Sequence, residues 1–332
     1  MGLRCQIDYL NAGNQNNAGA IVDYLLILVG LVCLFIGGEF LVRGAVAIAE
    51  RQGISKLVIG LTIVGFGTSM PELLVSMRAA LEGSSDIALG NVVGSNTANI
   101  LLILGLSALV YPIANWDRNV RRDILVALAV AALTLFLVQF SVIGRFAGLV
   151  MLTALAAYLY YVFNADRLAP SALTDETDPH RRSGLSPMLS GAAVVGGLVL
   201  LFFGADWLVG GATNIARNLG ISEAVIGLTI VAVGTSLPEL ATSVTAALRK
   251  QSDVALGNVV GSNIFNVLGI LGLTALVHPI GVGASFASFD VPVMLAVTAA
   301  LCGLLFAAKV IDRRIGALMI GAYVVYTAVL FI

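Results

Sequence analysis

The sequence predicts an all-α membrane protein in which ten transmembrane helices form two inverted five-helix repeats, with broken helices at the membrane midplane. Composition, a series of apolar runs and an internal repeat support this prediction. Of the 332 residues, 59% are hydrophobic and only 11% are charged, whereas soluble domains carry about 25% charged residues. At about 20 apolar residues per span, the composition allows on the order of ten spans and excludes a soluble enzyme with one anchor.

The apolar runs are bounded by charged residues or by Gly and Pro clusters, and they set the order of the elements. A polar N-terminal tail, 1–20, is followed by a first five-helix repeat, 21–163, a polar loop, 164–188, and a second five-helix repeat, 189–332. We expect the spans at 22–49, 57–81, 85–109, 122–140, 143–163, 189–216, 224–248, 252–276, 288–308 and 315–331.

Basic residues are distributed unevenly between the two sides of this topology. The loops after the odd-numbered spans hold 13 Lys and Arg residues, and the opposite side holds 4. Because cytoplasmic loops are enriched in Lys and Arg, we expect the loop 164–188 in the cytoplasm and both termini on the non-cytoplasmic side. The net charge of −1 and the absence of a long basic run argue against a nucleic-acid partner. Membrane lipid is the expected surrounding, and we expect a monomer.

Two blocks of sequence repeat at a constant offset of 167 residues, and we call them the repeat blocks. Val58–Glu72 matches Val225–Glu239 at 12 of 15 positions, and Ser84–Gly105 matches Gln251–Gly272 at 16 of 22. They place the two α-repeats at 58–105 and 225–272. Because each half has an odd number of spans, the second copy enters the membrane from the opposite side, which is the architecture of many secondary transporters. A duplication retained for packing alone would not explain the polar residues kept at membrane depth.

The first repeat block places a carboxylate near the middle of a span. Pro71 lacks a backbone N–H and interrupts the helix, so Glu72 follows a break near the bilayer centre, where an acid costs about 2.5–3.5 kcal/mol. Ser69 and Glu72 also have the spacing of a helix-capping box, which is the simpler interpretation. The second copy repeats the arrangement with Pro238 and Glu239. Two carboxylates with neighbouring carbonyls and hydroxyls form an all-oxygen site that suits a hard cation such as Ca²⁺.

The second repeat block contributes neutral oxygen ligands. Ser95 and Asn99 are four residues apart and share a helix face, and Ser262 with Asn266 repeats the pattern. These side chains can coordinate a cation, or they can only hydrogen-bond across helices, as such residues often do in membrane bundles. Their recurrence beside the carboxylate motifs favours coordination.

Glu39, Arg43 and Asp206 are further ionisable residues within the predicted spans. Glu39 and Arg43 have the i,i+4 spacing of a simple ion pair. Asp206 occupies the position of Glu39 in the second half, where Gly210 replaces Arg43. We assign Asp206 no ligand role.

The paired GTSxPE and GNVVGSNxxN motifs resemble the α-repeats of the Na⁺/Ca²⁺ exchanger family, within the cation/Ca²⁺ antiporter superfamily. The motifs cover 15 plus 22 residues in each half, and the ten-span layout extends the resemblance over nearly the whole chain. The resemblance implies a prokaryotic inner-membrane antiporter that exchanges Na⁺ for Ca²⁺ by alternating access and needs no cofactor. It also implies that the first and sixth spans slide across the other eight.

The resemblance also implies a ligand for each position of the motifs. Ca²⁺ would be bound by the carboxylates and by two threonine carbonyls, and flanking Na⁺ sites would use serines and backbone carbonyls, with two asparagines completing the central ring. The implied Ca²⁺ ligands are Glu72, Glu239, Thr68 and Thr235; the Na⁺ ligands are Ser69, Ser236, Ser95, Ser262, Gly65 and Ala232; and the ring residues are Asn99 and Asn266.

Departures from the family pattern bear on the coupling ion. Many prokaryotic and K⁺-dependent members of the family have Asp at the position of Asn266, so Asn at this position favours a K⁺-independent exchanger. The acidic motif of H⁺/Ca²⁺ exchangers is absent, because Gly94 and Gly261 stand in its place. H⁺/Ca²⁺ antiport is the alternative. An intramembrane enzyme with a carboxylate dyad lacks the expected GxGD motif, and a passive cation channel fits broken helices around a central acidic pair less well than a carrier.

Overall fold

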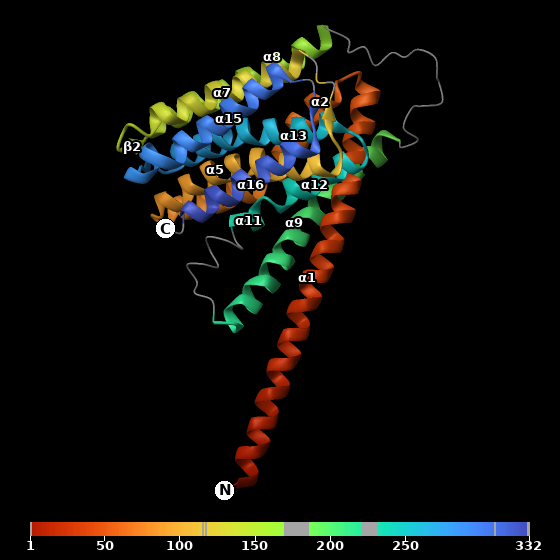
Figure 1. Ribbon diagram of the computed structural model, residues 1–332, viewed down its shortest axis with the longest axis vertical. Helices are drawn as coiled ribbons and strands as arrows, with labels where there is room; N and C mark the ends of the chain where they lie inside the picture. Colours follow the sequence, from red (N-terminus) through yellow and green to blue (C-terminus); the bar gives the residue numbers. More distant parts are fainter. Residues whose placement is uncertain are drawn as a thin grey trace.

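The computed structural model describes residues 2–114, 116, 118–168, 186–220, 232–308 and 310–330. Its helices gather into one bundle, and α1 (Gly2–Gln52) extends beyond the bundle towards the N-terminus (Figure 1). Because α1 begins at Gly2, the helix includes residues 2–20, for which the sequence predicts a polar tail. The predicted cytoplasmic loop, 164–188, lies largely outside the described residues.

In the first half, several helices are interrupted by π-helical segments, which the sequence pattern does not reveal. After α1, the elements are α2 (Lys56–Ile59), the π-helical η1 (Gly60–Val64), α3 (Gly65–Thr68), α4 (Met70–Leu81), α5 (Ser85–Ala98), the π-helical η2 (Asn99–Leu104), α6 (Gly105–Val110), β1 (Ile113–Ala114), α7 (Arg118–Leu137), β2 (Val142–Ile143) and α8 (Arg145–Leu168).

The described part of the second half follows this order, with one π-helical segment, η6, added before α15. Its elements are α9 (Pro187–Asn218), α11 (Ala232–Thr235), α12 (Leu237–Leu248), α13 (Ser252–Phe265), the π-helical η5 (Asn266–Leu271), α14 (Gly272–Val277), β3 (Ile280–Gly281), the π-helical η6 (Phe286–Asp290), α15 (Val291–Ala307), β4 (Val310–Ile311) and α16 (Arg313–Leu330).

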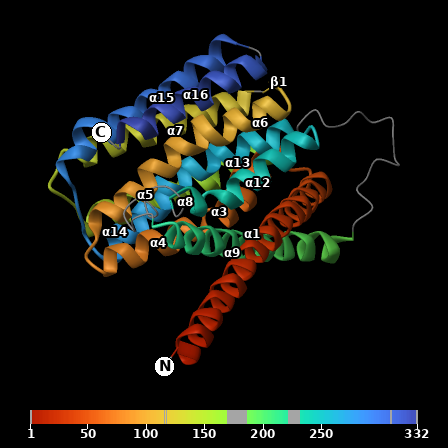
Figure 2. The ribbon, with the colours of Figure 1, turned by 60° about the horizontal axis from the view of Figure 1, so that its bottom comes forward.

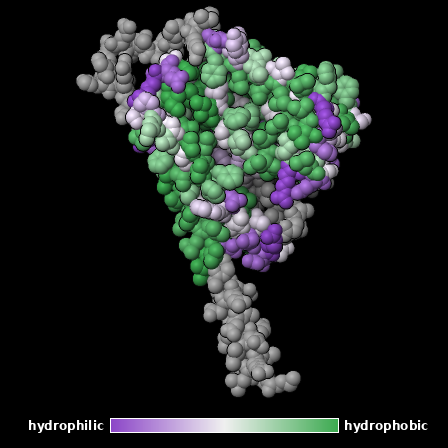
Figure 3. Space-filling model, turned by 180° about the vertical axis from the view of Figure 1, so that it is seen from behind, coloured by the Kyte–Doolittle hydropathy of each residue, from purple (hydrophilic) through white to green (hydrophobic). Residues whose placement is uncertain are grey.

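Within the described residues, seven helices are long and apolar enough to cross a membrane, or eight if the bent pair Lys56–Thr68 and Met70–Leu81 forms one span. Of the other two predicted spans, 122–140 corresponds to α7, whose first turns are charged, and 224–248 lies partly outside the described residues. Apolar side chains cover most of the face in Figure 3, and hydrophilic residues lie in patches near its margins. The chain is therefore a polytopic helical membrane protein.

Turns and caps at the helix ends also recur at the 167-residue offset. Gly53 and Gly220 have positive φ angles of 64° and 78°, which glycine adopts without a steric penalty. The next turn has Gly83 at φ 79° in the first half and Lys250 at φ 57° in the second. The backbone bend is therefore the same in both halves, although one of them uses a residue with a side chain.

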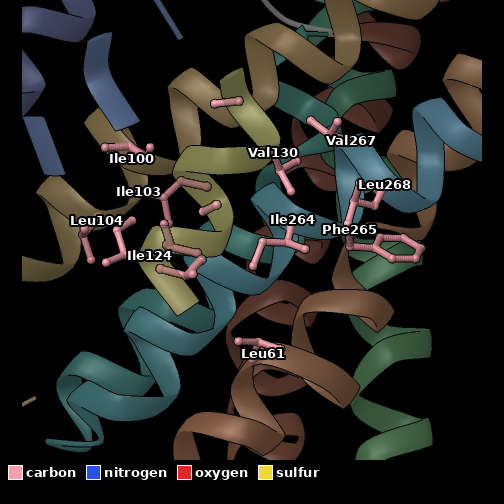
Figure 4. Close-up of a cluster of buried hydrophobic side chains, with 14 of the residues drawn as sticks. Leu61, Ile100, Ile103, Leu104, Ile124, Val130, Ile264, Phe265, Val267 and Leu268 are labelled. Carbon is pink, nitrogen blue, oxygen red and sulfur yellow. The ribbon is translucent and has the colours of Figure 1, made fainter. Parts of the chain in front are cut away.

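The most buried spans are Ser85–Val110 and Ser252–Val277, with 78% and 89% of their apolar windows buried. They form the centre of the bundle, and the main hydrophobic core surrounds them. Figure 4 shows part of this core. The labelled side chains come from η1, η2, α7, α13 and η5: Leu61, Ile100, Ile103, Leu104, Ile124, Val130, Ile264, Phe265, Val267 and Leu268.

Helices α1 and α9 pack against each other along a glycine seam at one side of the bundle (Figure 2). A Cβ atom added at Gly30 would lie 2.7 Å from the carbonyl oxygen of Gly204, and one at Gly197 would lie 2.6 Å from the backbone nitrogen of Leu41. Small residues allow such close approach between membrane helices. The seam has a seven-residue spacing on both helices: Gly30, Gly37 and Gly44 on α1, and Gly197, Gly204 and Gly211 on α9.

Two short antiparallel strand pairs join the halves. β1 pairs with β4 and β2 pairs with β3. The strands lie at the two ends of α7 and of α15, which pack against each other. At the 167-residue offset β1 corresponds to β3, and β2 to β4 within one residue. β1 therefore pairs with β4, the counterpart of β2, and β2 pairs with β3, the counterpart of β1.

Candidate cation-binding site

Both predicted helix breaks around the prolines are bounded by a serine. Ser69, with φ −83° and ψ 9°, separates α3 from α4, and the two helical stretches bend by 44°. Ser236 separates α11 from α12 with nearly the same angles, φ −89° and ψ 7°. Pro71 and Pro238 each occupy the second position of the following helix, where a missing N–H costs nothing. The breaks place Glu72 and Glu239 in the first turns of α4 and α12.

The two carboxylates are buried and bonded to serines of the opposite half. Glu72 and Glu239 are each 1% exposed. Ser69 Oγ donates to Glu239 Oε1 over 2.8 Å, and Ser236 Oγ donates to Glu72 Oε1 over 3.0 Å. Neither serine makes a side-chain cap bond to its own helix. The capping-box interpretation is therefore wrong, because these hydroxyl groups bind across the interface between the halves.

Four buried side-chain oxygens of this region have no hydrogen-bond partner. They are Glu72 Oε2, Glu239 Oε2, Asn99 Oδ1 and Asn266 Oδ1. A buried acceptor without a donor costs about 1–3 kcal/mol, and more if it is charged. Two carboxylate oxygens and two amide oxygens form a donor set that suits Na⁺ or Ca²⁺ as a transported ion, because hard cations prefer oxygen ligands.

The amide nitrogens of the two ring asparagines bind across the halves. Asn99 Nδ2 donates to Asn263 Oδ1 over 2.9 Å. Asn266 Nδ2 donates to Asn96 Oδ1 over 3.0 Å and to Ser95 Oγ over 3.1 Å. Sequence reasoning left open whether these residues coordinate an ion or bridge helices. In the structure their nitrogens form the bridge, and their oxygens have no hydrogen-bond partner.

Two further asparagines brace the helices that carry the carboxylates. Asn91 Nδ2 donates to the carbonyl oxygen of Glu72 over 3.0 Å, and Asn258 Nδ2 donates to that of Glu239 over 3.3 Å. Asn258 Oδ1 also accepts a bond from Thr68 Oγ1 at 3.2 Å. Sequence reasoning missed both residues as parts of the site, although their recurrence within the repeat blocks is a signal that could have found them.

The remaining predicted residues lie around the same centre. Ser262 Oγ donates to the carbonyl oxygen of Gly65 over 3.3 Å, so these two predicted Na⁺ ligands come from opposite halves and meet. Thr68 and Thr235 are buried at the ends of α3 and α11. Ala232 begins α11, directly after the part of the chain that the structure does not describe.

Glu39 lies outside this centre and has two basic partners. It pairs with Arg43, as the i,i+4 spacing predicts, and also with Arg249 at the end of α12. The sequence could not reveal the second partner, which is 210 residues away. The ion pair connects α1 to the helix that carries Glu239.

The fold and the site together define a polytopic membrane protein with buried, unpartnered oxygens at its centre. A family model for sodium/calcium exchanger proteins matches residues 22–164 and 189–332. The chain is 36% identical to the sodium/calcium exchanger MaX1 of Methanosarcina acetivorans, over 93% of this chain and 99% of that protein. It is 35% identical to the inner membrane protein YrbG of Escherichia coli, over 92% and 96% of the two chains.

Solved structures of the sodium-calcium exchanger NCX_Mj have the same fold. In one of them, from a protein soaked with Na⁺ and Ca²⁺, the match has a TM-score of 0.81 at 33% identity and covers 93% of this chain and 98% of that chain. The chain therefore belongs to the sodium/calcium exchanger family. It is a membrane transporter of the cation/Ca²⁺ antiport type and not an enzyme.

Proposed function

We propose that this chain exchanges Na⁺ for Ca²⁺ by alternating access, without K⁺, in a prokaryotic inner membrane. The observation that carries the proposal is the set of four buried oxygens without hydrogen-bond partners, contributed equally by the two halves. Two of them belong to carboxylates, so the charge of one Ca²⁺ offsets both. Support also comes from the names of the exchangers MaX1 and NCX_Mj, which the chain matches over nearly its whole length.

Competition between the ions follows from charge. A cavity with two carboxylates does not neutralise a Ca²⁺ ion and several Na⁺ ions together, and a protein interior screens the excess charge less than water does. Ca²⁺ and Na⁺ therefore occupy the site in turn. Thr68, Thr235, Gly65, Ala232 and the flanking serines add the remaining ligands in this proposal. The amide of Asn266 in place of a carboxylate makes K⁺ unnecessary.

The proposed architecture has ten spans in two inverted repeats, with both termini outside the cytoplasm and the chain acting as a monomer. The strand pairs support the inversion, because the pair β1–β4 and the pair β3–β2 are related by the repeat: β3 is the counterpart of β1, and β2 is the counterpart of β4. In the switch between the two open faces, α1 and α9 move together across the remaining helices. Their glycine seam supports movement as one unit, since it brings the two backbones into direct contact.

The test is uptake of ⁴⁵Ca²⁺ into proteoliposomes with an imposed Na⁺ or pH gradient, at clamped voltage and with or without K⁺. We expect the Na⁺ gradient to drive uptake, and the pH gradient and K⁺ to have no effect. Uptake driven by the pH gradient would establish H⁺/Ca²⁺ antiport, and uptake that needs no counter-ion gradient would establish a channel.

The site assignment is tested by Glu72→Gln and Glu239→Gln. Each variant removes one of the two charges, and we expect each to lower the rate of Na⁺-driven uptake about a hundredfold or more. Glu82→Gln is the matched control, because Glu82 is exposed at the C-terminal end of α4, the helix whose first turn contains Glu72. Exchange retained in both site variants would contradict the assignment.

A further inference from the structure

Asn96 and Asn263 form a reciprocal pair across the two halves, next to the ring asparagines. Asn96 Nδ2 donates to the backbone carbonyl of Asn263 over 3.2 Å, and Asn263 Nδ2 donates to the backbone carbonyl of Asn96 over 3.1 Å. Both side chains are buried, at 3% and 5% exposure. A backbone carbonyl can only accept a hydrogen bond. Each amide is therefore fixed with its nitrogen towards the carbonyl and its oxygen in the opposite direction.

The fixed oxygens determine the orientation of the ring amides in turn. Asn263 Oδ1 can only accept, so Asn99 must present its nitrogen to it, and the bond between them is 2.9 Å. Asn96 Oδ1 imposes the same orientation on Asn266, over 3.0 Å. The oxygens of Asn99 and Asn266 must then face away from these bonds. Both oxygens are among the buried side-chain atoms that have no hydrogen-bond partner.

An amide has one end that binds a cation and one end that repels it. If Asn99 or Asn266 rotated by half a turn, an NH₂ group would take the position of an oxygen ligand. In addition, two oxygens would face each other at the contact with Asn263 or Asn96. The two backbone carbonyls thus select which end of each ring amide is available to the ion.

We propose that Asn96 and Asn263 are positioning residues that hold the ring amides of Asn99 and Asn266 with their oxygens towards the transported ion. This inference rests on the proposed function of the central site. Partners outside the ligand shell that orient ligands usually contribute 10- to 100-fold to metal affinity. The two halves differ in one respect: Ser95 Oγ is a second acceptor for Asn266 Nδ2, so the orientation of Asn266 depends less on a single neighbour.

The experiment is a double-mutant cycle on apparent ion affinity in proteoliposomes, with Ca²⁺ and Na⁺ as the probes. Asn263→Leu keeps a similar side-chain volume but has no acceptor for Asn99. We expect it to raise the half-saturating Ca²⁺ concentration about tenfold, with a smaller effect on the maximal rate. In an Asn99→Asp background both terminal atoms of the ligand are oxygens and no orientation is needed. There, Asn263→Leu should cause no loss of affinity beyond about twofold, because the oxygen of Asn263 no longer has a donor to hold.

The matched control combines Asn263→Leu with Asn266→Asp. Asn266 is held by Asn96 and not by Asn263, so the tenfold loss should persist in this background. The mirror cycle uses Asn96→Leu with Asn266→Asp. Because Ser95 still accepts from Asn266, the loss caused by Asn96→Leu alone should be smaller than that caused by Asn263→Leu.

An equal loss from Asn263→Leu in the wild-type and Asn99→Asp backgrounds would mean a packing role and would overturn the inference. If the wild-type protein shows no Na⁺-driven exchange, the proposed function fails, and the same cycle is then measured as equilibrium ⁴⁵Ca²⁺ binding in detergent. Variants are first checked by gel filtration, and Asn263→Ala replaces Asn263→Leu if the latter aggregates. Wild-type protein that binds neither Ca²⁺ nor Na⁺ would overturn both proposals.

Discussion

The contacts made by the two halves match closely at the centre of the molecule and less closely at its edge. In the centre the main contacts of one half have counterparts in the other, as the crossed bonds from Ser69 and Ser236 to the carboxylates show, and the second acceptor of Asn266 is an exception. At the edge the counterparts diverge. Arg249 corresponds to Glu82 and pairs with Glu39 of α1, whereas Glu82 pairs with Arg78 in its own helix. The comparison indicates that ion binding requires two equivalent contributions, whereas the ends of the helices are free to differ.

The glycine seam is the largest matched feature outside the centre, and its disruption should have the largest effect. Gly30→Val and Gly197→Val each place a side chain against backbone atoms less than 3 Å away. We expect similar losses from the two, about 2–3 kcal/mol of stability, measured as the melting temperature in detergent, together with loss of exchange. Gly196→Val is the control, since nothing lies within 4 Å of a Cβ at Gly196. Unequal losses from the two seam variants would break the equivalence of the halves.

The ion pair between Glu39 and Arg249 sharpens the comparison at the edge. Arg249→Gln removes one partner from a carboxylate whose side chain is 17% exposed, and we expect a loss of about 1 kcal/mol. The reversed pair, Glu39→Arg with Arg249→Glu, should recover part of it. Arg78→Gln should leave the melting temperature unchanged, because the pair of Arg78 with Glu82 is exposed and lies within one helix. Equal effects of Arg78→Gln and Arg249→Gln would contradict the difference between the two edges.

The smallest effect is expected at the turn where Lys250 replaces the glycine of the first half. Lys250 has φ 57°, which costs a residue with a side chain about 1–2 kcal/mol. Lys250 Nζ also lies 5.9 Å from the ring centroid of Tyr111, a contact worth about 0.5–1 kcal/mol. Lys250→Gly should therefore raise stability by about 0.5 kcal/mol, and Gly83→Lys should lower it by about 1 kcal/mol. Thermal melts of both variants measure the difference, and destabilisation by Lys250→Gly would mean that the ring contact dominates.

The sequence predicted most of the helices and the two proline breaks because both depend on local signals. Apart from the start of α1, apolar runs begin and end within a few residues of the observed helices, as for α5 to α6 at Ser85–Val110 against the predicted 85–109. Pro71 and Pro238 indicate the breaks because proline has no backbone N–H for the helical hydrogen bond. The repeat blocks then identify Glu72 and Glu239 without any knowledge of contacts.

Contacts between the halves could not be predicted, because they depend on relative placement. The amide of Asn99 reads equally as a ligand or as a bridge until the position of Asn263 is known. No periodic pattern in the sequence indicates that Glu39 pairs with Arg249. The π-helical segments that begin at Asn99 and Asn266 also have no amino-acid composition that distinguishes them from α-helix. The direction of an amide group is a property of the folded bundle and not of the motif.

The exchanged strand pairs have a mechanical consequence. α7 and α15 are packed side by side, and at both ends the chain that enters one helix is hydrogen-bonded to the chain that leaves the other. α7 and α15 are thus linked to each other by a strand pair at each end. Two helices joined in this way resist sliding past each other, so they can stay fixed during the proposed movement of α1 and α9.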